Sequence, residues 1–209
     1  MIKAISKITF FKASSIFLGL AIMLSMLTSC ENKNEATPKP KAYPKITFPE
    51  KSYEKYTSKT CGFNFEYPDY ATIKEDSLFM NEKTENPCWF DIIFPDFNAD
   101  IHCSYYEISD KKNLDSLIYD SFALVGKHTV KAQFIEEKII DLPGKGGGIL
   151  FKLSGPVASP TQFFITDSVH HFIRGSLYFN NKVQLDSMKI IYDFVDEDIE
   201  KMLENFYWD

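Results

Sequence analysis

Alternation of apolar and polar side chains predicts β-strands from residue 63 onward. Phe63, Phe65 and Tyr67 alternate with small or polar residues, which is the period of two of a half-buried strand, and a Pro-Asp turn follows. A second run at 90–94 repeats the pattern, and the run at 99–106 follows it after a short turn. Two strands joined so closely are expected to form a hairpin.

Helical periodicity replaces this alternation at two places. Apolar residues recur three or four positions apart over 114–125, with Asp110 or Asn113 as the candidate N-cap and Gly126 as the expected stop. The last segment carries an apolar stripe made of Ile191, Phe194, Val195, Ile199, Met202, Leu203 and Phe206. Its acidic residues fall mostly on the other face, namely Asp193, Asp196, Glu197, Glu200 and Glu204. The pattern predicts an amphipathic terminal helix whose acidic face is solvated or binds a partner.

Four more strand-like runs lie between these helices, at 133–140, 147–153, 162–166 and 171–179. Strand pairs without crossover helices predict an α+β domain with a mostly antiparallel sheet, one inserted helix and one terminal helix. The opening motif at 63–68 and the order of elements resemble the Mog1/PsbP-like sandwich. That resemblance concerns the fold and implies no activity.

The first thirty residues have the organisation of a bacterial lipoprotein signal peptide. Three lysines precede an apolar stretch at 15–27, which has the length of a signal h-region and is shorter than the ~20 residues that span a bilayer. The stretch runs into Leu27-Thr28-Ser29-Cys30, which resembles a lipobox. We therefore predict cleavage before Cys30 and lipidation of this residue. An ordinary secretory signal or an uncleaved anchor is the alternative.

Lipidation of Cys30 predicts attachment to a membrane and exposure to the periplasm, with the inner and outer membranes both left open. Two or three acyl chains hold a protein stably, whereas one chain does so only marginally. Residues 30–59 are rich in proline and lysine and predict an extended tether, although the apolar residues after Tyr43 are expected to lie along the domain. The expected organisation is a signal peptide at 1–29, a lipidated tether at 30–59 and one α+β domain at 60–209.

Charge and composition narrow the class of partner. The chain has a net charge of −6, and removing the three lysines of residues 1–29 leaves 20 basic against 29 acidic residues, or −9. Nucleic acid and anionic lipid surfaces attract basic proteins, so neither is an expected partner. Aromatic residues make up 15% of the chain, which is too high for a disordered stalk.

Candidate chemistry is sparse along the chain. Asp167, Ser168 and His171 are the residue types of a hydrolase triad, but they lie on one expected turn without a Gly-x-Ser-x-Gly elbow. The four histidines and four cysteines lack the spacing of metal-binding motifs. The glycine run at 144–148 lacks the spacing of a phosphate-binding loop and is expected to be a turn. We therefore expect a protein without enzymatic activity, metal or other cofactor.

The run from Gln162 to Phe179 contains more apolar side chains than one sheet face can bury. The run is therefore expected to form either central core strands or a partner surface, with one aromatic set exposed. The residues assigned to that surface are Phe163, Phe164, His171, Arg174 and Tyr178.

Three cysteines remain for pairing once Cys30 is lipidated. An exported protein enters an oxidising compartment, where thiols that meet form disulfides. Cys103 lies inside a strand pattern, where a free cysteine behaves as a small buried apolar residue. Cys61 and Cys88 each stand at the start of a strand, so we predict a Cys61–Cys88 disulfide.

Several motifs, in order along the chain, resemble the gliding-motility lipoprotein D family of Bacteroidota. The matching stretches are Pro38-Lys-Pro-Lys41, Phe48-Pro-Glu-Lys-Ser-Tyr53, Cys61-Gly-Phe-Asn-Phe-Glu-Tyr-Pro-Asp-Tyr-Ala71, Asn86-Pro-Cys-Trp89, Phe94-Pro-Asp-Phe97, Lys127-His128, Gln162-Phe-Phe-Ile-Thr-Asp-Ser168 and His171-Phe-Ile-Arg-Gly-Ser-Leu-Tyr-Phe179. Both cysteines of the predicted disulfide fall within these motifs, so the resemblance supports that pair.

The resemblance implies a non-enzymatic component required for gliding motility and type IX protein secretion, with other proteins of that machinery as partners. The alternative, from a different class, is a periplasmic enzyme or ligand-binding lipoprotein on the same fold. A deep polar pocket lined by Asp167, His171 and Arg174 would favour the alternative. A flat aromatic surface would favour a scaffold.

Overall fold

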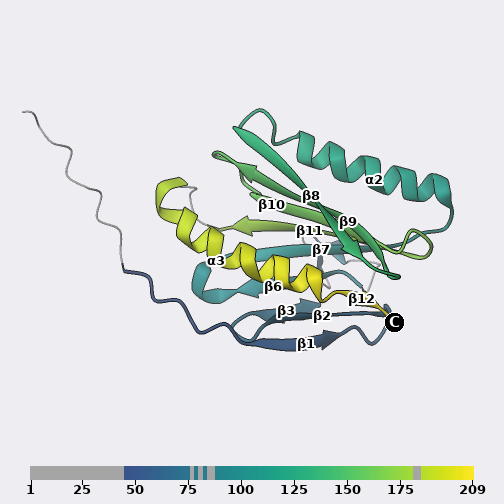
Figure 1. The fold of residues 1–209 in the computed structure, drawn as a ribbon, viewed down its shortest axis with the longest axis horizontal. Coiled ribbons are helices and arrows are strands. Elements are labelled where there is room, and N and C mark those ends of the chain that lie inside the picture. Colours follow the sequence, from purple (N-terminus) through teal and green to yellow (C-terminus); the bar gives the residue numbers. More distant parts are fainter. Residues whose placement is uncertain (1–44, 76–77, 80–81, 84–87, 181–184) are drawn as a thin grey trace, which may run out of the picture. The chain divides into compact units, whose positions relative to one another are not determined.

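The computed structural model describes residues 45–75, 78–79, 82–83, 88–180 and 185–209 (Figure 1). The signal peptide, Cys30 and the tether up to residue 44 lie outside these residues. The compact unit begins at Lys45 and not at residue 60. It begins earlier because β1 (Tyr53–Thr57) pairs with β2 (Phe63–Pro68) and because Phe48 packs against the core.

A seven-stranded sheet forms the centre of the fold (Figure 1). Its strands in spatial order are β3 (Thr72–Glu75), β6 (Phe90–Phe94), β7 (Ala99–Glu107), β11 (His171–Phe179), β10 (Thr161–Thr166), β9 (Gly146–Ser154) and β8 (Phe134–Leu142). Every neighbouring pair is antiparallel. Two described helices flank the sheet, so the prediction of an α+β fold with a mostly antiparallel sheet is confirmed.

A second sheet has three strands in the order β1-β2-β12, where β12 is Tyr207–Trp208. It brings the C-terminus beside β2, since Tyr207 pairs with Asn64 and Trp208 with Phe63. The remaining described elements are the strand pair β4 (Leu78–Phe79) and β5 (Glu82–Lys83) and the 3₁₀ helix η1 (Pro95–Phe97).

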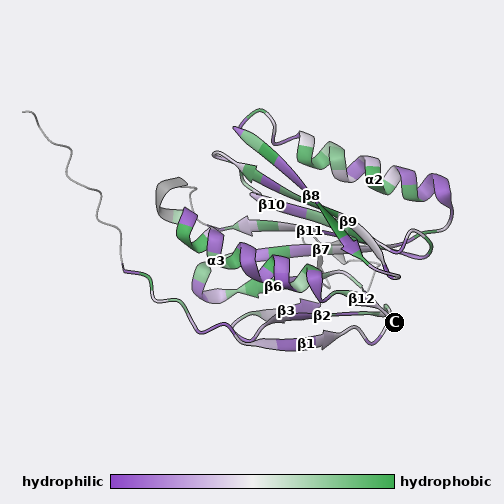
Figure 2. Cartoon of the chain, in the orientation of Figure 1, coloured by the Kyte–Doolittle hydropathy of each residue, from purple (hydrophilic) through white to green (hydrophobic). Residues whose placement is uncertain are grey.

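The helices α2 (Lys111–Gly126) and α3 (Leu185–Glu204) lie on opposite faces of the seven-stranded sheet (Figure 1). Under α2, one cluster of buried side chains contains Val125, Phe151, Leu153, Val157, Phe164 and Phe172. On the other face, α3 and β2 cover the larger core, which includes Phe63, Phe65, Phe163, Ile165, Val195 and Ile199. Figure 2 shows hydrophobic and hydrophilic positions alternating along α3, as expected of an amphipathic helix. The centre of the sheet is thus buried on both faces.

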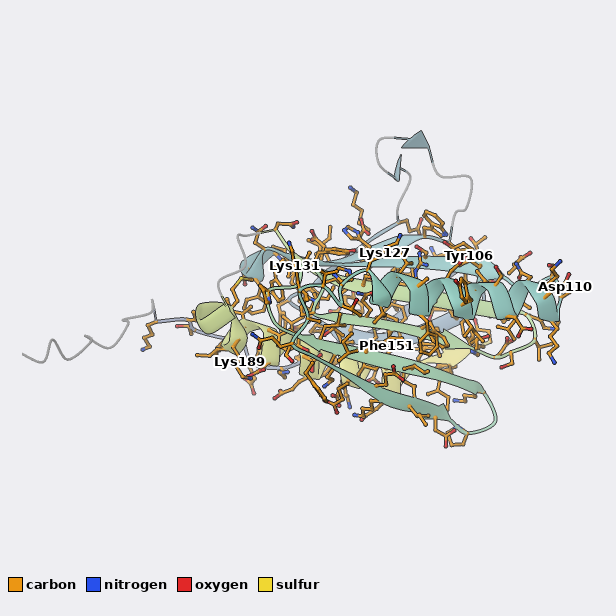
Figure 3. All side chains as sticks on the ribbon, turned by 90° about the horizontal axis from the view of Figure 1, so that it is seen from above. Tyr106, Asp110, Lys127, Lys131, Phe151 and Lys189 are labelled. Carbon is orange, nitrogen blue, oxygen red and sulfur yellow. A yellow bond between two sulfur atoms is a disulfide. The ribbon has the colours of Figure 1, made fainter. Side chains whose placement is uncertain are left out.

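The helix cap and the glycine turn lie where the sequence predicts them. The Asp110 side chain accepts a hydrogen bond from the backbone N–H of Asn113 at 2.8 Å, which makes Asp110 the N-cap of α2. Asp110 and Lys127 mark the two ends of this helix in Figure 3. The glycine run at 144–148 forms the turn between β8 and β9 and the start of β9. Within the described ranges, neither helix is long and apolar enough to cross a bilayer.

Candidate functional site

The turn between β10 and β11 uses the residue types of a hydrolase triad to fix its own backbone. Oδ1 of Asp167 accepts hydrogen bonds from the backbone N–H groups of Val169, His170 and His171 at 2.9, 2.8 and 2.8 Å. Burial alone would raise the pKa of the Asp167 carboxyl, but these three donors outweigh burial and lower the pKa. Ser168 adopts a left-handed φ of 64°. Asp167 therefore binds the backbone of His171 and holds the turn closed.

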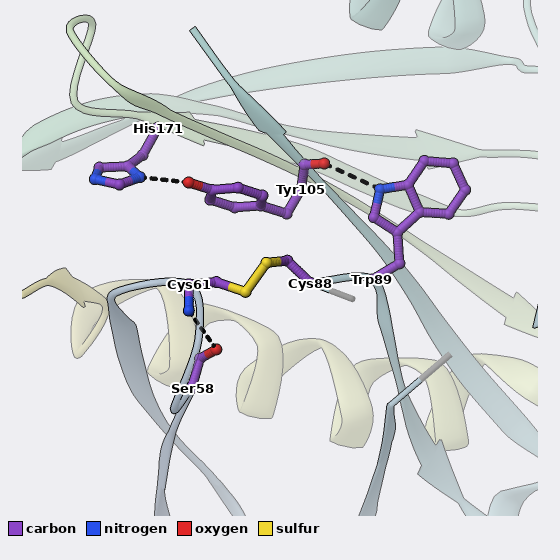
Figure 4. Close-up of a disulfide and its surroundings, with 6 residues drawn as sticks. All are labelled: Ser58, Cys61, Cys88, Trp89, Tyr105 and His171. Atoms are coloured by element: carbon purple, nitrogen blue, oxygen red, sulfur yellow. Dashed lines mark hydrogen bonds between the residues drawn. A yellow bond between two sulfur atoms is a disulfide. The ribbon is translucent and has the colours of Figure 1, made fainter. Parts of the chain in front are cut away.

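The ring of His171 belongs to an aromatic corner beside the disulfide (Figure 4). Its Nδ1 lies 2.6 Å from the hydroxyl oxygen of Tyr105, and its ring stacks on that of Trp208 with centroids 5.0 Å apart. Tyr105 lies on β7, which pairs with β11, and its backbone carbonyl accepts a hydrogen bond from Trp89 Nε1 at 3.0 Å. The imidazole is thus positioned by Tyr105 and Trp208, with no contact to Asp167 of the kind a triad requires.

Cys61 and Cys88 form a disulfide whose Cα atoms are 5.9 Å apart (Figure 4). The bond joins the segment before β2 to the segment before β6, and the backbone N–H of Cys61 also donates to Ser58 Oγ at 3.2 Å. Cys103 is a free, buried cysteine, and burial raises the pKa of its thiol well above its ordinary value. The structure therefore pairs the two cysteines at the strand starts and leaves the third inside the core.

The five residues assigned to a partner surface do not share one surface. Strand alternation places Phe163 and His171 on the α3 side of the sheet, and Phe164, Arg174 and Tyr178 on the α2 side. Phe163 and Phe164 are buried, with 2% and 4% of their surface exposed. The expectation of an exposed aromatic set is wrong here, because a helix covers each face and the two sets fill two separate cores.

Arg174 and Tyr178 instead belong to a partly exposed polar strip, which we define as Asp91, His102, Arg174 and Tyr178 on β6, β7 and β11. The His102 ring lies 5.5 Å from the Tyr178 ring, and its Nδ1 lies 2.6 Å from Oδ1 of Asp91. Arg174 is the only arginine in the chain. No group of three potential ligands is arranged to hold a metal ion, here or elsewhere in the described part of the chain.

The acidic face of α3 is only partly solvated, in contrast to the prediction. Asp196 is buried, accepts a hydrogen bond from Thr161 Oγ1 at 2.9 Å and pairs with Lys152 Nζ at 2.6 Å. Lys152 also pairs with Glu200, which binds Lys138 of β8 at 2.6 Å. Burial alone would lower the pKa of Lys152, but its hydrogen bonds to the two carboxylates outweigh burial and raise it. These acids therefore attach α3 to β8, β9 and β10.

A cavity of about 640 Å³ lies between one end of the sheet and α3. Its lining is mostly apolar and includes Leu153, Val157, Phe179, Met188 and Tyr192. Lys189, labelled on α3 in Figure 3, is also part of the lining. The volume is typical of small-molecule sites. Pro160 places the cavity at the start of β10, whereas the Asp167 turn follows the end of that strand, so the residues expected to line a polar pocket do not line this one.

Comparison with solved structures finds similarity to a cyanobacterial PsbP (CyanoP) from Synechocystis sp. PCC 6803. The two chains are 12% identical with a TM-score of 0.44, and the match covers 77% of this chain and 95% of that one. A likeness of this size says nothing about function. No curated protein sequence matches the chain.

A family model gives a match over most of the chain. The model described as "Gliding motility lipoprotein GldD" matches residues 33–208, a range that contains every helix and strand described above. The match begins three residues after Cys30, the residue predicted to be lipidated, and ends at Trp208. The chain therefore belongs to the family of the gliding motility lipoprotein GldD.

Proposed function

We propose that this protein is a lipid-anchored, non-catalytic scaffold or assembly component of the machinery for gliding motility and type IX secretion. Membership of the GldD family carries the proposal, because it covers the whole folded domain. The lipobox at Cys30 supports lipid attachment, and the signal peptide before it supports a position in the cell envelope facing the periplasm. The partners are other proteins of the machinery.

The bonding of the polar side chains supports a role without catalysis. A catalytic triad needs the carboxylate on Nδ1 of the imidazole, so that the other ring nitrogen can act as a base. Here Nδ1 of His171 faces the Tyr105 hydroxyl, and the Asp167 carboxylate binds three backbone N–H groups. Both side chains hold local structure.

The polar strip is the surface that we assign to a partner within the machinery. Its four side chains project from three neighbouring strands, so their spacing is fixed by the sheet. It contains an arginine and a tyrosine, Arg174 and Tyr178, which are residue types enriched at protein interfaces. A partner bound there would lie beside α2 without displacing it.

The apolar cavity supports a second candidate function, a lipoprotein that binds a small apolar ligand. Its volume of about 640 Å³ is large enough, and its mostly apolar lining includes the charged residue Lys189. This candidate places the functional residues at one end of the sheet, around the loop after β9 and the described start of α3. The scaffold proposal places them on the polar strip of β6, β7 and β11.

Substitutions in the native cell distinguish the two candidates. Arg174→Glu and Tyr178→Ser should abolish gliding and secretion of type IX cargo, and should remove specific partners from crosslinked, affinity-purified protein. Met188→Trp, which fills the cavity, should leave both activities intact. Lys112→Glu makes the same charge change as Arg174→Glu at an exposed position of α2 and serves as the control. Wild-type gliding and secretion in both strip variants would contradict the assigned surface, and their loss in Met188→Trp would favour ligand binding.

A further inference from the structure

One edge of the seven-stranded sheet is a long strand that is bonded on one side only. Within the described residues, β8 pairs with β9 and has no strand on its outer side. It has nine residues, whereas β3 at the opposite edge has four. Figure 3 shows the hairpin of β8 and β9 at the margin of the sheet, beside α2. An edge strand presents a row of unpaired backbone N–H and C=O groups, and natural sheets commonly keep such edges short.

The side chains of β8 combine exposed apolar and charged groups. Phe134 and Ile139 are 64% and 80% exposed, which is unusual for large apolar residues. Between them stand three exposed charged residues, Glu136, Glu137 and Lys138. Charges on an edge strand discourage pairing when they meet like charges or apolar groups. The order of the charges therefore determines which strand can pair with β8.

We propose that β8 pairs with β8 of a second copy of this chain, antiparallel and two-fold symmetric about Glu137. In this register Glu136 lies opposite Lys138, and Ile135 lies opposite Ile139. Symmetry repeats each pair on the other side of the axis. The two opposite-charge pairs thus lie on the α3 side of the sheet and the two apolar pairs lie on the α2 side. The seven-stranded sheets of the two copies become continuous.

The neighbouring symmetric registers are unfavourable. Centring the pairing on Glu136 places this residue opposite itself and Ile135 opposite Glu137. Centring it on Lys138 places two lysines together and Ile139 opposite Glu137. Both registers pair charged with apolar side chains, and such mismatches specify register in a sheet.

The contacts around β8 agree with the register centred on Glu137. Lys138 already binds Glu200 of α3 at 2.6 Å, so its ammonium group is held on the α3 side of the strand. In the described part of the chain Glu136 makes no ion pair, and it lies on the same side as Lys138. In the dimer, Lys138 of the partner copy lies opposite Glu136 and forms an ion pair with it, and the two-fold axis repeats this pair. The unfavourable contact is Glu137 against itself at the axis, on the α2 side.

Cysteine crosslinking of the full chain in the native envelope tests this register. In the dimer, the two copies of residue 137 are directly opposite, with Cα atoms ~4.5–5.5 Å apart, which is within disulfide range. Glu137→Cys should therefore form a reducible dimer under mild oxidation. Asp141→Cys, exposed on the same strand, is the control, because its two copies would lie about 27 Å apart along the strands at ~3.4 Å per residue. The remaining cysteines are the disulfide pair, the buried Cys103 and the anchor at Cys30.

The crosslinking result decides the proposal in either direction. Glu137→Cys should give at least roughly tenfold more dimer than Asp141→Cys, since only residue 137 meets its own copy within disulfide reach. Equal dimer in both variants, or no dimer in Glu137→Cys, would overturn the proposal. A reducible adduct of another mass would also overturn it, in favour of a strand from a different protein.

Exchanging the charges provides an independent test. Glu136→Lys places lysine opposite Lys138 in both symmetric pairs and should weaken the dimer of detergent-solubilised full chain at least about fivefold, as measured by light scattering over a concentration series. The double variant Glu136→Lys with Lys138→Glu restores opposite charges between the copies and should recover part of the dimer, although it removes the ion pair of Lys138 with Glu200. An unchanged mass distribution in the single variant would contradict the register.

Discussion

Lys51 Nζ lies 3.0 Å from Oδ1 of Asp198, a carboxylate whose side chain is 1% exposed. The hydroxyls of Tyr53 and Tyr70 donate to the same carboxylate, at 2.9 and 2.5 Å. Burial, and after it Asp198, raises the pKa of both phenols, so both remain protonated donors. One buried acid of α3 therefore fixes the segment before β1, β1 itself and the turn after β2.

Replacing Asp198 by Ala should lower the free energy of unfolding by about 3–5 kcal/mol, which is typical of removing one partner from a buried ion pair. In this variant the hydroxyls of Tyr53 and Tyr70 lose their acceptor, and Lys51 loses its buried partner. Glu197→Ala is the matched control, because Glu197 also binds Lys51, at 2.9 Å, but is 73% exposed. The control should cost less than about 1 kcal/mol. Urea unfolding measures both values, and equal losses would contradict the importance of the buried carboxylate.

Loss of the Cys61–Cys88 disulfide should destabilise the domain by roughly 3–4 kcal/mol, from the entropy of a loop closed between residues 27 apart. The measurement is urea unfolding with and without reductant. A double Cys61→Ser and Cys88→Ser variant should not respond to reductant. Alkylation should label Cys103 only after unfolding, because its thiol is buried. Labelling of Cys103 in the folded protein would contradict its position in the core.

The sequence predicts the helices and strands of this fold better than it predicts which elements pack against one another. Alternation in β10 predicts that Phe163 and Phe164 point to opposite faces of the sheet. It does not predict that a helix covers each face. Coverage depends on α2, which precedes β10, and on α3, which follows it. A partner surface predicted from this run alone therefore includes two side chains that lie in separate cores.

Asp196 and β1 show the same limit in two other ways. The helical pattern places Asp196 on the polar face of α3, and its burial becomes favourable through Lys152 and Thr161, which are 44 and 35 residues away. β1 lacks an apolar alternation of its own, since three of its five residues are exposed. Its pairing with β2 makes it a strand, and no local pattern contains that information.

Gly148→Ala should lower the free energy of unfolding by more than about 2 kcal/mol, because a Cβ there cannot be accommodated without moving the backbone. Gly148 pairs with Ile165, and an added Cβ would lie 1.8 Å from the backbone carbonyl oxygen of Phe164. Gly126→Ala is the control, since a Cβ there meets nothing within 4 Å at the end of α2. The control should change stability by about 1 kcal/mol or less, towards greater stability. Equal destabilisation in urea would contradict the steric argument.

Cys30→Ala should block both lipidation and the cleavage before residue 30, because the acyl chains attach to this cysteine. The variant should therefore keep its signal peptide and migrate at the precursor size. Fractionation and gel mobility of the protein from whole cells measure both effects. A variant of mature size that stays in the membrane fraction would contradict attachment through Cys30.

The turn at Asp167 should make stability depend on pH in the acidic range. The three backbone donors lower the pKa of the Asp167 carboxyl below its ordinary value of 3.8, so the folded state favours the ionised form. For a carboxyl with a lowered pKa, the added stability is present above the ordinary pKa and is lost as the pH falls through the lowered one. Wild-type protein should therefore lose stability below about pH 4, partly through this residue.

Asp167→Ala isolates that contribution. At pH 7 the variant should be less stable than wild type by about 1–3 kcal/mol, because the N–H groups of Val169, His170 and His171 lose their acceptor. The difference should shrink towards about pH 3, since the protonated carboxyl of the wild type is a weaker acceptor. Asp167→Asn keeps a carbonyl acceptor without the charge, so it should be intermediate at pH 7 and should not titrate. Urea unfolding of the three proteins at both pH values measures this, and a constant difference between wild type and Asp167→Ala would show that the carboxylate charge does not stabilise the turn.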